Sequence, residues 1–444
     1  MEIISFRTPG LGDQTYLLTY EGRGVLVDPQ RDLGRFLDAA AERDVELRFV
    51  LETHLHNDYV SGGEQAALRT GAELVLPAAA APAYRHTPAF HLEDIEGGAG
   101  LTLRPIHTPG HTPEHTSYLV LIDGEPAALF SGGSLLVGSA GRPDLLGPER
   151  ARSLARLQHL SLRRLAALPP EVGLYPTHGE GSFCSATGAG RLTSSIAAER
   201  AGNPMLAIDD PEEFADTLLE APAPIPAFYR YMGPANTLGV PPMPPVRVPE
   251  LDAVPEGSHV VDLRPRQAQA RGMLPGSVGI ELRDDFGSWA GWLLPYAEPI
   301  TLVAEPDQDV TEAVTQLAQI GIDTVRGVVR DLGRDATQTY ELADLDGFVK
   351  RLAQPGAQLL DVRMPSERER VRLPGAVERF LPDLFTRGVP GELDPERPVL
   401  VACASGRRAA IAAGFLAGRG YRPLVLTGAG VAEVAAAVER HTAA

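Results

Sequence analysis

The first 220 residues alternate short hydrophobic runs with longer stretches of helical periodicity. The short runs predict β-strands at residues 15–19, 24–28 and 49–51. Helical spacing, with start signals at Pro148 and at Thr187 and Gly188, predicts α-helices at residues 33–43, 63–69, 148–167 and 190–202. Strands that alternate with helices are typical of an α/β fold.

The pattern changes between residues 221 and 249, where proline occurs at nine positions. Proline lacks an N–H donor and fixes φ, so this density predicts neither a regular helix nor a central strand. A boundary between domains is therefore expected inside this stretch.

After the boundary the chain repeats itself. The segment VVDLR at 260–264 returns as LLDVR at 359–363, and LPGSV at 274–278 returns as LPGAV at 373–377, each 99 positions later. This spacing predicts a duplicated domain of about a hundred residues. The expected domains are residues 1–235, 245–345 and 346–444.

The composition argues against proteins that bind nucleic acid or anionic lipid and against proteins that span a membrane. A formal charge of −18 opposes binding to nucleic acid or to anionic lipid, and no apolar run in the 444 residues is long enough to span a membrane. The amino-terminal segment resembles a first strand rather than a secretory signal, and only two cysteines occur. We therefore expect a cytoplasmic enzyme that acts on small molecules. A homo-oligomer is compatible with this composition.

One of the cysteines, Cys403, lies between a predicted buried strand at 398–402 and an alanine-rich helix at 409–419. Backbone N–H groups of such a loop, together with the N-terminus of the following helix, stabilise a thiolate. The alternative is a buried structural cysteine at the end of a strand. The chemistry of the loop favours the interpretation of Cys403 as a nucleophile over that of a structural cysteine.

This segment, Cys403-Ala404-Ser405-Gly406-Arg407-Arg408, resembles the single-domain form of the rhodanese family, whose pattern is Cys-x-Ser-Gly-x-Arg. The resemblance implies that Cys403 accepts a sulfane sulfur as a persulfide and passes it to a thiol. It also implies that Arg408 closes the loop and faces an anionic substrate. The first repeat has Glu305 at the position equivalent to Cys403 and is expected to be structural.

Histidines recur at three places in the first domain. His54 and His56 follow a predicted buried strand, His111 lies in HTPGHTP, and His178 lies in PTHGEGSFC. Imidazoles from separate loops can complete the coordination of one metal ion. The set predicts a metal site.

The order and spacing resemble the metallo-β-lactamase superfamily, which implies a four-layer αββα sandwich with a metal site at one edge of the sheets. By this resemblance His54, His56 and His111 are the first-choice ligands, with Asp58 and His178 nearby. Two departures stand out: Tyr59 replaces a second-site histidine, and Gly133 occupies the place of a metal-binding aspartate.

The combination of this domain with two rhodanese-like repeats resembles the persulfide dioxygenase–sulfurtransferase fusions. There one mononuclear Fe(II) is held by two histidines and an aspartate, which correspond here to His54, His111 and Gly133. Because glycine supplies no carboxylate, the metal either recruits His56, Asp58 or water, binds weakly, or is absent. Zinc is the alternative metal.

The second cysteine, Cys184, lies six residues after His178. It is expected to be either a thiol that handles persulfide in the same pocket or a small apolar residue of the core.

Three hypotheses follow. The first is a bifunctional enzyme that acts on low-molecular-weight thiols and persulfides and transfers sulfur through Cys403. The second is a metal-dependent thioester hydrolase like glyoxalase II. The third is an inactive metallo-β-lactamase platform attached to an active sulfurtransferase.

Overall fold

Residues 1–179, 181–184, 191–220 and 223–442 are described by a computed structural model, in which the chain divides into two units. The first unit consists of Met1–Pro245 with Leu317–Gly321, and the second of Val246–Gln316 with Ile322–Ala444. No helix among the described residues is long and apolar enough to cross a membrane.

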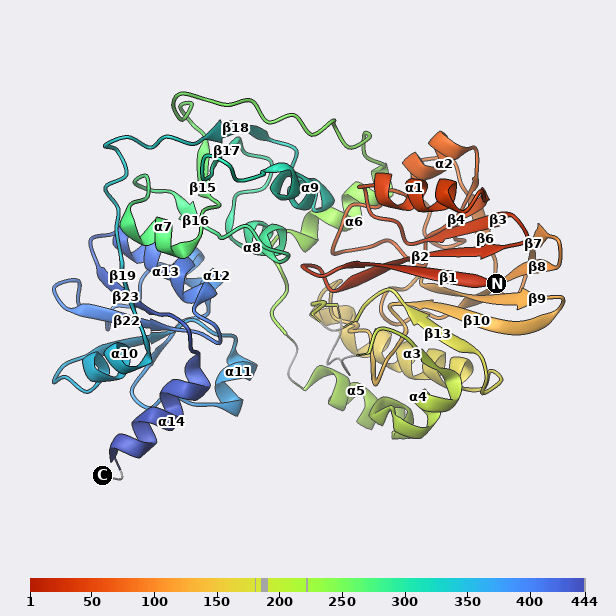
Figure 1. Ribbon diagram of the computed structural model, residues 1–444. Helices are drawn as coiled ribbons and strands as arrows, with labels where there is room; N and C mark the ends of the chain where they lie inside the picture. The colour runs from red at the N-terminus through yellow and green to blue at the C-terminus, as the bar shows by residue number, and fades with distance from the viewer. Residues whose placement is uncertain (180, 185–190, 221–222, 443–444) are drawn as a thin grey trace. The chain divides into compact units, whose positions relative to one another are not determined.

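The first unit is built on two six-stranded sheets (Figure 1), with strand orders β1-β2-β3-β4-β5-β6 and β14-β13-β10-β9-β8-β7. A short hairpin, β11-β12, follows β10. The bounds of the strands are β1 (Glu2–Thr8), β2 (Asp13–Tyr20), β3 (Arg23–Val27), β4 (Glu46–Leu51), β5 (Glu73–Pro77), β6 (Thr87–Ala89), β7 (Ile95–Gly98), β8 (Leu101–His107), β9 (Thr116–Ile122), β10 (Glu125–Gly132), β11 (Leu135–Leu136), β12 (Ser139–Ala140), β13 (Gly173–Pro176) and β14 (Ser194–Ser195).

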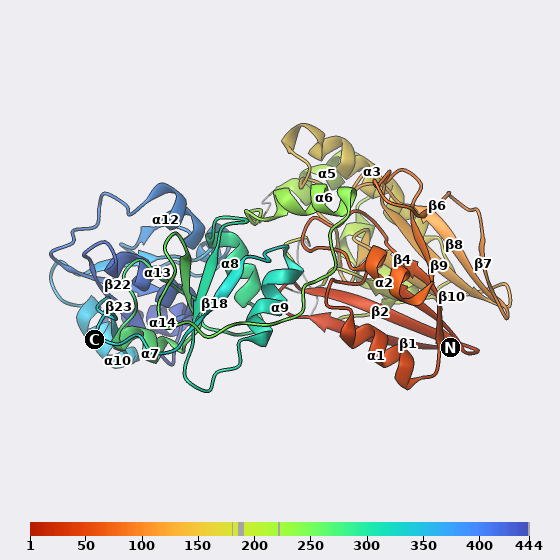
Figure 2. The same cartoon turned by 90° about the horizontal axis from the view of Figure 1, so that it is seen from above.

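Helices cover the outer faces of both sheets (Figure 2). In that view α3 and α5 lie at the top of the first unit and α1 at the bottom. The bounds of the helices are α1 (Gly34–Glu42), α2 (Gly63–Thr70), α3 (Pro148–Ala166), α4 (Ile196–Gly202), α5 (Pro211–Leu219) and α6 (Tyr229–Leu238), with a 3-10 turn at Pro204–Ala207.

Side-chain alternation along the strands explains the layers. Tyr16 and Leu18 of β2 pack with Tyr118 and Val120 of β9 in the core between the sheets, while Leu17 faces the core beneath α1 and α2. Successive side chains of a strand point to opposite faces, so each central strand supplies two cores. The predicted αββα sandwich is confirmed.

Two local predictions are wrong. A regular helix, α6, occupies part of the proline-rich stretch, with Pro234 inside it. The side chain of Asn236 in this helix donates to the carbonyl oxygens of His56 and Tyr59, so tertiary hydrogen bonds offset the low helical propensity. Helix α4 begins at Ile196 after the cap Ser195, and the predicted start at Thr187 and Gly188 lies outside the described residues.

The second unit contains two parallel sheets of related topology. The orders β16-β15-β17-β18 and β21-β20-β22-β23 are equivalent, and β19 extends the second sheet beside β23. Strands β15 and β16 begin at His259 and Val278, and β20 and β21 begin 99 residues later, at Gln358 and Val377. The sequence repeat is therefore a repeat of structure.

The remaining bounds are β15 (His259–Asp262), β16 (Val278–Gly279), β17 (Ile300–Val303), β18 (Val325–Val329), β19 (Glu341–Ala343), β20 (Gln358–Asp361), β21 (Val377–Glu378), β22 (Pro398–Ala402), β23 (Arg422–Leu426), α7 (Arg266–Arg271), α8 (Phe286–Leu293), α9 (Thr311–Gln319), α10 (Leu345–Leu352), α11 (Pro365–Arg370), α12 (Leu381–Arg387), α13 (Arg407–Ala417) and α14 (Val431–Thr442). Helices α10 and α14 pack together on the sheet that contains β22.

Candidate functional sites: a histidine cluster and a cysteine loop

The histidines of the first unit gather where strands of both sheets end. His54 and His56 follow β4, His111 lies in the loop between β8 and β9, and His178 follows β13. One ring nitrogen from each of His54, His111 and His178 lies within 4.8 Å of those of the other two. The tertiary structure therefore brings together three of the predicted ligands.

These three imidazoles are buried and suited to bind a cation. Burial lowers the pKa of His54, His111 and His178, and neighbouring imidazoles lower those of His54 and His111 further. All three rings are therefore neutral near pH 7, which is the form that ligates a metal.

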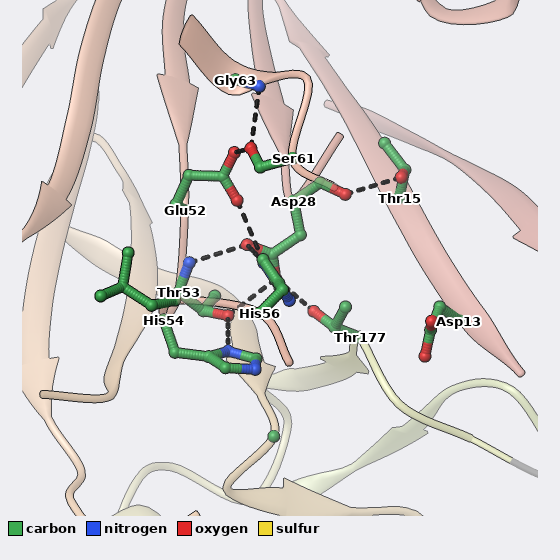
Figure 3. Close-up of polar contacts among 12 residues, drawn as sticks. Asp13, Thr15, Asp28, Glu52, Thr53, His54, His56, Ser61, Gly63 and Thr177 are labelled. Carbon is green, nitrogen blue, oxygen red and sulfur yellow. Dashed lines mark hydrogen bonds and ion pairs between the residues drawn. The ribbon is translucent and has the colours of Figure 1, made fainter. Parts of the chain in front are cut away.

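His56, a predicted ligand, has a different environment. Its Nε2 donates to Glu52 Oε2 at 3.0 Å and lies 3.3 Å from Asp28 Oδ1 (Figure 3). Burial alone would lower the pKa of His56, but Asp28 and Glu52 raise it well above 6.5. The side chain is therefore an imidazolium between two carboxylates, and the hydroxyl of Tyr59 lies 3.0 Å from the same nitrogen.

Asp58 and Cys184 lie beside the cluster. Asp58 Oδ2 is 3.3 Å from His178 Nδ1 and accepts from the thiol of Cys184 at 3.3 Å. Burial raises the pKa of Asp58 to about 7, and burial followed by Asp58 raises that of Cys184 well above 9. Cys184 is thus a protonated thiol at the edge of the histidine cluster.

A second grouping of possible ligands overlaps the first. Ring nitrogens of His56 and His178 and a carboxylate oxygen of Asp58 also lie within 4.8 Å of one another. Asp28, Glu52 and His56 form a third such group.

Gly133 follows β10 and contacts the cluster through its backbone. Its N–H donates to His115 Nε2 at 2.9 Å, and a Cβ at this position would lie 2.3 Å from His111 Cδ2. The ring of His111 therefore occupies the space that a side chain at 133 would need.

A cavity of about 590 Å³ adjoins these residues. Its lining includes Leu55 and Asn57 on either side of His56, Thr112 beside His111, and Tyr229, whose hydroxyl lies 3.6 Å from Cys184 Sγ. Arg230 on the same helix supplies a positive charge to the lining. The volume suits a small-molecule ligand.

The cysteine loop lies in the second unit. Cys403 directly follows β22, and its Sγ accepts the N–H of Ala409 in α13 at 3.4 Å. Gly406 has φ +77° at the N-cap of that helix, a conformation that glycine adopts without strain. The strand, turn and helix thus place the sulfur atom at a helix N-terminus, as predicted.

Arg408 follows the loop and is paired within the protein. Its two terminal nitrogens donate to the carboxylate of Glu367 in α11 at 2.5 and 2.6 Å. Burial alone would lower the pKa of Arg408, but Glu367 and Cys403 raise it. The guanidinium is a fixed positive charge near Cys403.

The first repeat contacts the same loop. Arg266 donates to the Ser405 carbonyl oxygen at 3.1 Å, Asp285 lies 3.8 Å from Arg407, and the Trp289 ring lies 5.9 Å from the Arg408 guanidinium carbon. The repeat without a cysteine therefore borders the loop that has one.

Sequence reasoning missed four polar residues around the histidines. Asp13 accepts from His178, Asp28 and Glu52 accept from His56, and His115 accepts from Gly133. Asp28 and Glu52 directly follow buried strands, which is the signal that could have identified them.

Comparison with known proteins agrees with this geometry. A model of the metallo-beta-lactamase superfamily matches residues 9–178, and a model of the rhodanese-like domain matches residues 344–436. A hydroxyacylglutathione hydrolase from Acidiphilium cryptum is 31% identical over 47% of this chain and 92% of its own length. The chain belongs to the metallo-beta-lactamase superfamily.

Solved structures are similar as well. A metallo-beta-lactamase from Staphylococcus aureus has a TM-score of 0.68 and 27% identity, covering 74% of this chain and 99% of its own. ETHE1 from Myxococcus xanthus has a TM-score of 0.47 and 30% identity, covering 53% of this chain and 98% of its own. The residues that the two family models match show that this member of the superfamily carries a rhodanese-like domain after its metallo-beta-lactamase fold.

Proposed function

We propose that this superfamily member is a bifunctional enzyme of persulfide metabolism. In this proposal the first unit oxidises a low-molecular-weight persulfide, and Cys403 of the second unit transfers sulfane sulfur to or from a small thiol. The observation that supports it is that one chain holds two cysteines in separate polar sites. Cys403 lies at a helix N-terminus beside a fixed cation, and Cys184 lies beside a histidine cluster.

Sulfur transfer at Cys403 follows from its loop. The Cys403 thiolate attacks the outer sulfur of a persulfide donor, a new S–S bond forms, and the donor leaves as a thiolate. An acceptor thiolate then attacks the outer sulfur of the Cys403 persulfide and regenerates Cys403. The Ala409 N–H and the Arg408 guanidinium stabilise negative charge on sulfur before and after each step.

The histidine cluster fits a resident metal, because His111 Nε2 is buried and has no partner among the described residues. His54, His111 and His178 are the side chains that would hold it, and we propose iron as the metal, with zinc as the alternative. A ferrous ion held by a few protein ligands supplies open positions for substrate and dioxygen. The protein's own contribution is to bind the persulfide in the adjoining cavity, where Arg230 attracts a carboxylate of the substrate.

Thioester hydrolysis is the rival function, supported by the name of the relative from A. cryptum. A binuclear hydrolase site would need more ligands than this chain offers, because Tyr59 and Gly133 replace two of them. His56 is in addition committed to Asp28 and Glu52. An inactive platform would leave the histidines without a metal ion. Against this, His111 Nε2 is buried and has no hydrogen-bond partner among the residues that the structure describes.

Metal analysis of anaerobically purified protein, combined with oxygen uptake on glutathione persulfide, tests the first unit. Bound iron with persulfide-dependent uptake supports the dioxygenase. Bound zinc with turnover of a glutathione thioester would contradict the dioxygenase proposal and support a thioester hydrolase. The absence of any bound metal would support an inactive first unit instead.

The second unit is tested with Cys403→Ser. We expect this variant to lose sulfur transfer from thiosulfate or persulfide to a thiol, whereas Cys184→Ser should retain it. Transfer that survives in Cys403→Ser would contradict the proposed role of this residue.

A further inference from the structure

We propose that the metal of the first unit is held by three imidazoles, those of His54, His111 and His178, and that Gly133 is required for this arrangement. The inference rests on the proposed function only in assuming a resident metal. It replaces a ligand set of two histidines and a carboxylate with three nitrogen donors.

Polar contacts at the far side of each ring favour a proton on Nδ1. His111 Nδ1 donates to the Arg142 carbonyl oxygen at 2.9 Å, and His178 Nδ1 lies 2.8 Å from Asp13 Oδ1. His54 Nδ1 lies 2.9 Å from the hydroxyl oxygen of Thr53. Each of these partners can accept the Nδ1 proton, and such outer partners orient metal-binding histidines.

The other hydrogen bond of the Thr53 hydroxyl determines which group is the donor in its contact with His54. It donates its own proton to Asp28 Oδ2 at 2.8 Å, so it accepts from His54 (Figure 3). All three rings therefore turn an unprotonated Nε2 towards one another.

The unprotonated Nε2 atoms of the three histidines face one another, and a cation between them would balance their lone pairs. His54 Nε2 and His178 Nε2 are 3.3 Å apart, and neither carries a proton to share. His111 Nε2 is buried without a hydrogen-bond partner among the described residues. Three facing acceptors without a donor repel one another, whereas a bound cation satisfies all of them.

Gly133 makes the position of His111 possible. A Cβ on residue 133 would lie 2.3 Å from His111 Cδ2 and 2.8 Å from His111 Nε2. The His111 ring cannot retreat easily, because its backbone N–H is bonded to Gln158 and its Nδ1 to Arg142. An aspartate at 133 would therefore displace a ligand rather than add one.

The overlapping group of His56, Asp58 and His178 is less suitable. The nitrogen of His178 that faces Asp58 is Nδ1, which is committed to Asp13. His56 Nε2 is committed to Glu52, whereas His56 Nδ1 and Asp58 Oδ1 are buried without a partner among the described residues, as His111 Nε2 is. The zinc affinities of the variants below distinguish the two groups.

X-ray absorption spectroscopy of the zinc-loaded wild-type protein counts the imidazoles directly, without any variant that could misfold. Scattering from three histidines is expected. Two histidines with a carboxylate or thiolate would overturn the proposal.

Zinc affinity of variants gives a second test. His54→Ala, His111→Ala and His178→Ala should each bind zinc at least about tenfold more weakly. Asp58→Asn changes a side chain that contacts His178 Nδ1 but is not a proposed ligand, and it should lose less affinity than any of these three variants. His159→Ala, which removes a buried histidine that bonds the Ile208 carbonyl oxygen instead, should keep the wild-type affinity. Retained affinity in His54→Ala and His111→Ala, with a loss in Asp58→Asn as large as that in His178→Ala, would favour the overlapping group and overturn the proposal.

Substitutions at Gly133 distinguish the steric effect of a side chain at this position from the effect of an added metal ligand. Gly133→Ala adds a Cβ without a ligand, and we expect it and Gly133→Asp both to weaken zinc binding. Tighter binding by Gly133→Asp would show that this chain merely lacks a carboxylate ligand, and would overturn the proposal. Because zinc binding is measured without persulfide or oxygen, absence of oxygen uptake by a protein with three histidine ligands would contradict the proposed function alone.

Discussion

Arg266 Nη1 donates a hydrogen bond to the backbone carbonyl oxygen of Ser405 at 3.1 Å. Arg266 lies in the first repeat, and Ser405 is two residues after Cys403 in the second. The guanidinium is held in turn by Glu281, with Nη2 and Oε2 2.8 Å apart. The first repeat therefore holds the backbone of the loop that carries Cys403, although the first repeat has no cysteine at the equivalent position.

Removal of this contact should impair sulfur transfer. A hydrogen bond from a charged group contributes about 1.5–3 kcal/mol. If half of this free energy is needed at the transition state, Arg266→Met should lower kcat/KM by about four- to twelvefold. Arg271→Met changes an exposed arginine of the same helix and should have no effect. The pH profile of transfer should also shift in Arg266→Met, because the loop positions the thiolate. An unchanged rate and profile would show that the contact is only structural.

The pairing of Arg408 with Glu367 predicts a pH dependence of stability. Burial alone would raise the pKa of Glu367, but Arg408 lowers it below 4.5. A lowered carboxyl pKa stabilises the fold above pH 4.5 and loses this contribution as pH falls through the folded-state value. Calorimetry of Glu367→Gln should show a lower melting temperature at pH 7 and a smaller decline on acidification. Glu369→Gln, an exposed change in the same helix, should behave as wild type.

The two thiols should react at different rates. Both thiols are buried, but burial followed by Asp58 raises the pKa of Cys184 well above 9, which leaves very little thiolate at pH 7.5. Cys403 accepts a helix N–H and lies near a guanidinium. Mass spectrometry after brief treatment with iodoacetamide should find Cys403 modified first. Faster modification of Cys184 would contradict the environment described for it.

Metal removal should destabilise the first unit. A ligand that binds only the folded state at 100 times its Kd adds about 2.7 kcal/mol to the free energy of unfolding. Chelation should therefore lower the melting temperature of the wild-type protein, and added zinc should restore it. His111→Ala should show neither change, whereas His159→Ala should show both.

The sequence by itself determined much of the local structure. The buried strand at 398–402 is β22 at the predicted bounds, and the repeat of 99 residues reappears in the starts of β15 and β20. These features depend on hydrophobic periodicity and on short motifs, which act between near neighbours in the chain. For the same reason the sequence indicated the loops that carry His54, His111, His178 and Cys403.

Only the tertiary structure decided what each side chain does. His178 receives its orientation from Asp13, which is 165 residues away, and Arg266 reaches Ser405 across 139 residues. Helix α6 formed in spite of its prolines because Asn236 bonds to the segment that carries His56. The proton position on an imidazole, and the space left beside a glycine, depend on atoms supplied by distant segments, and no local pattern of residues contains them.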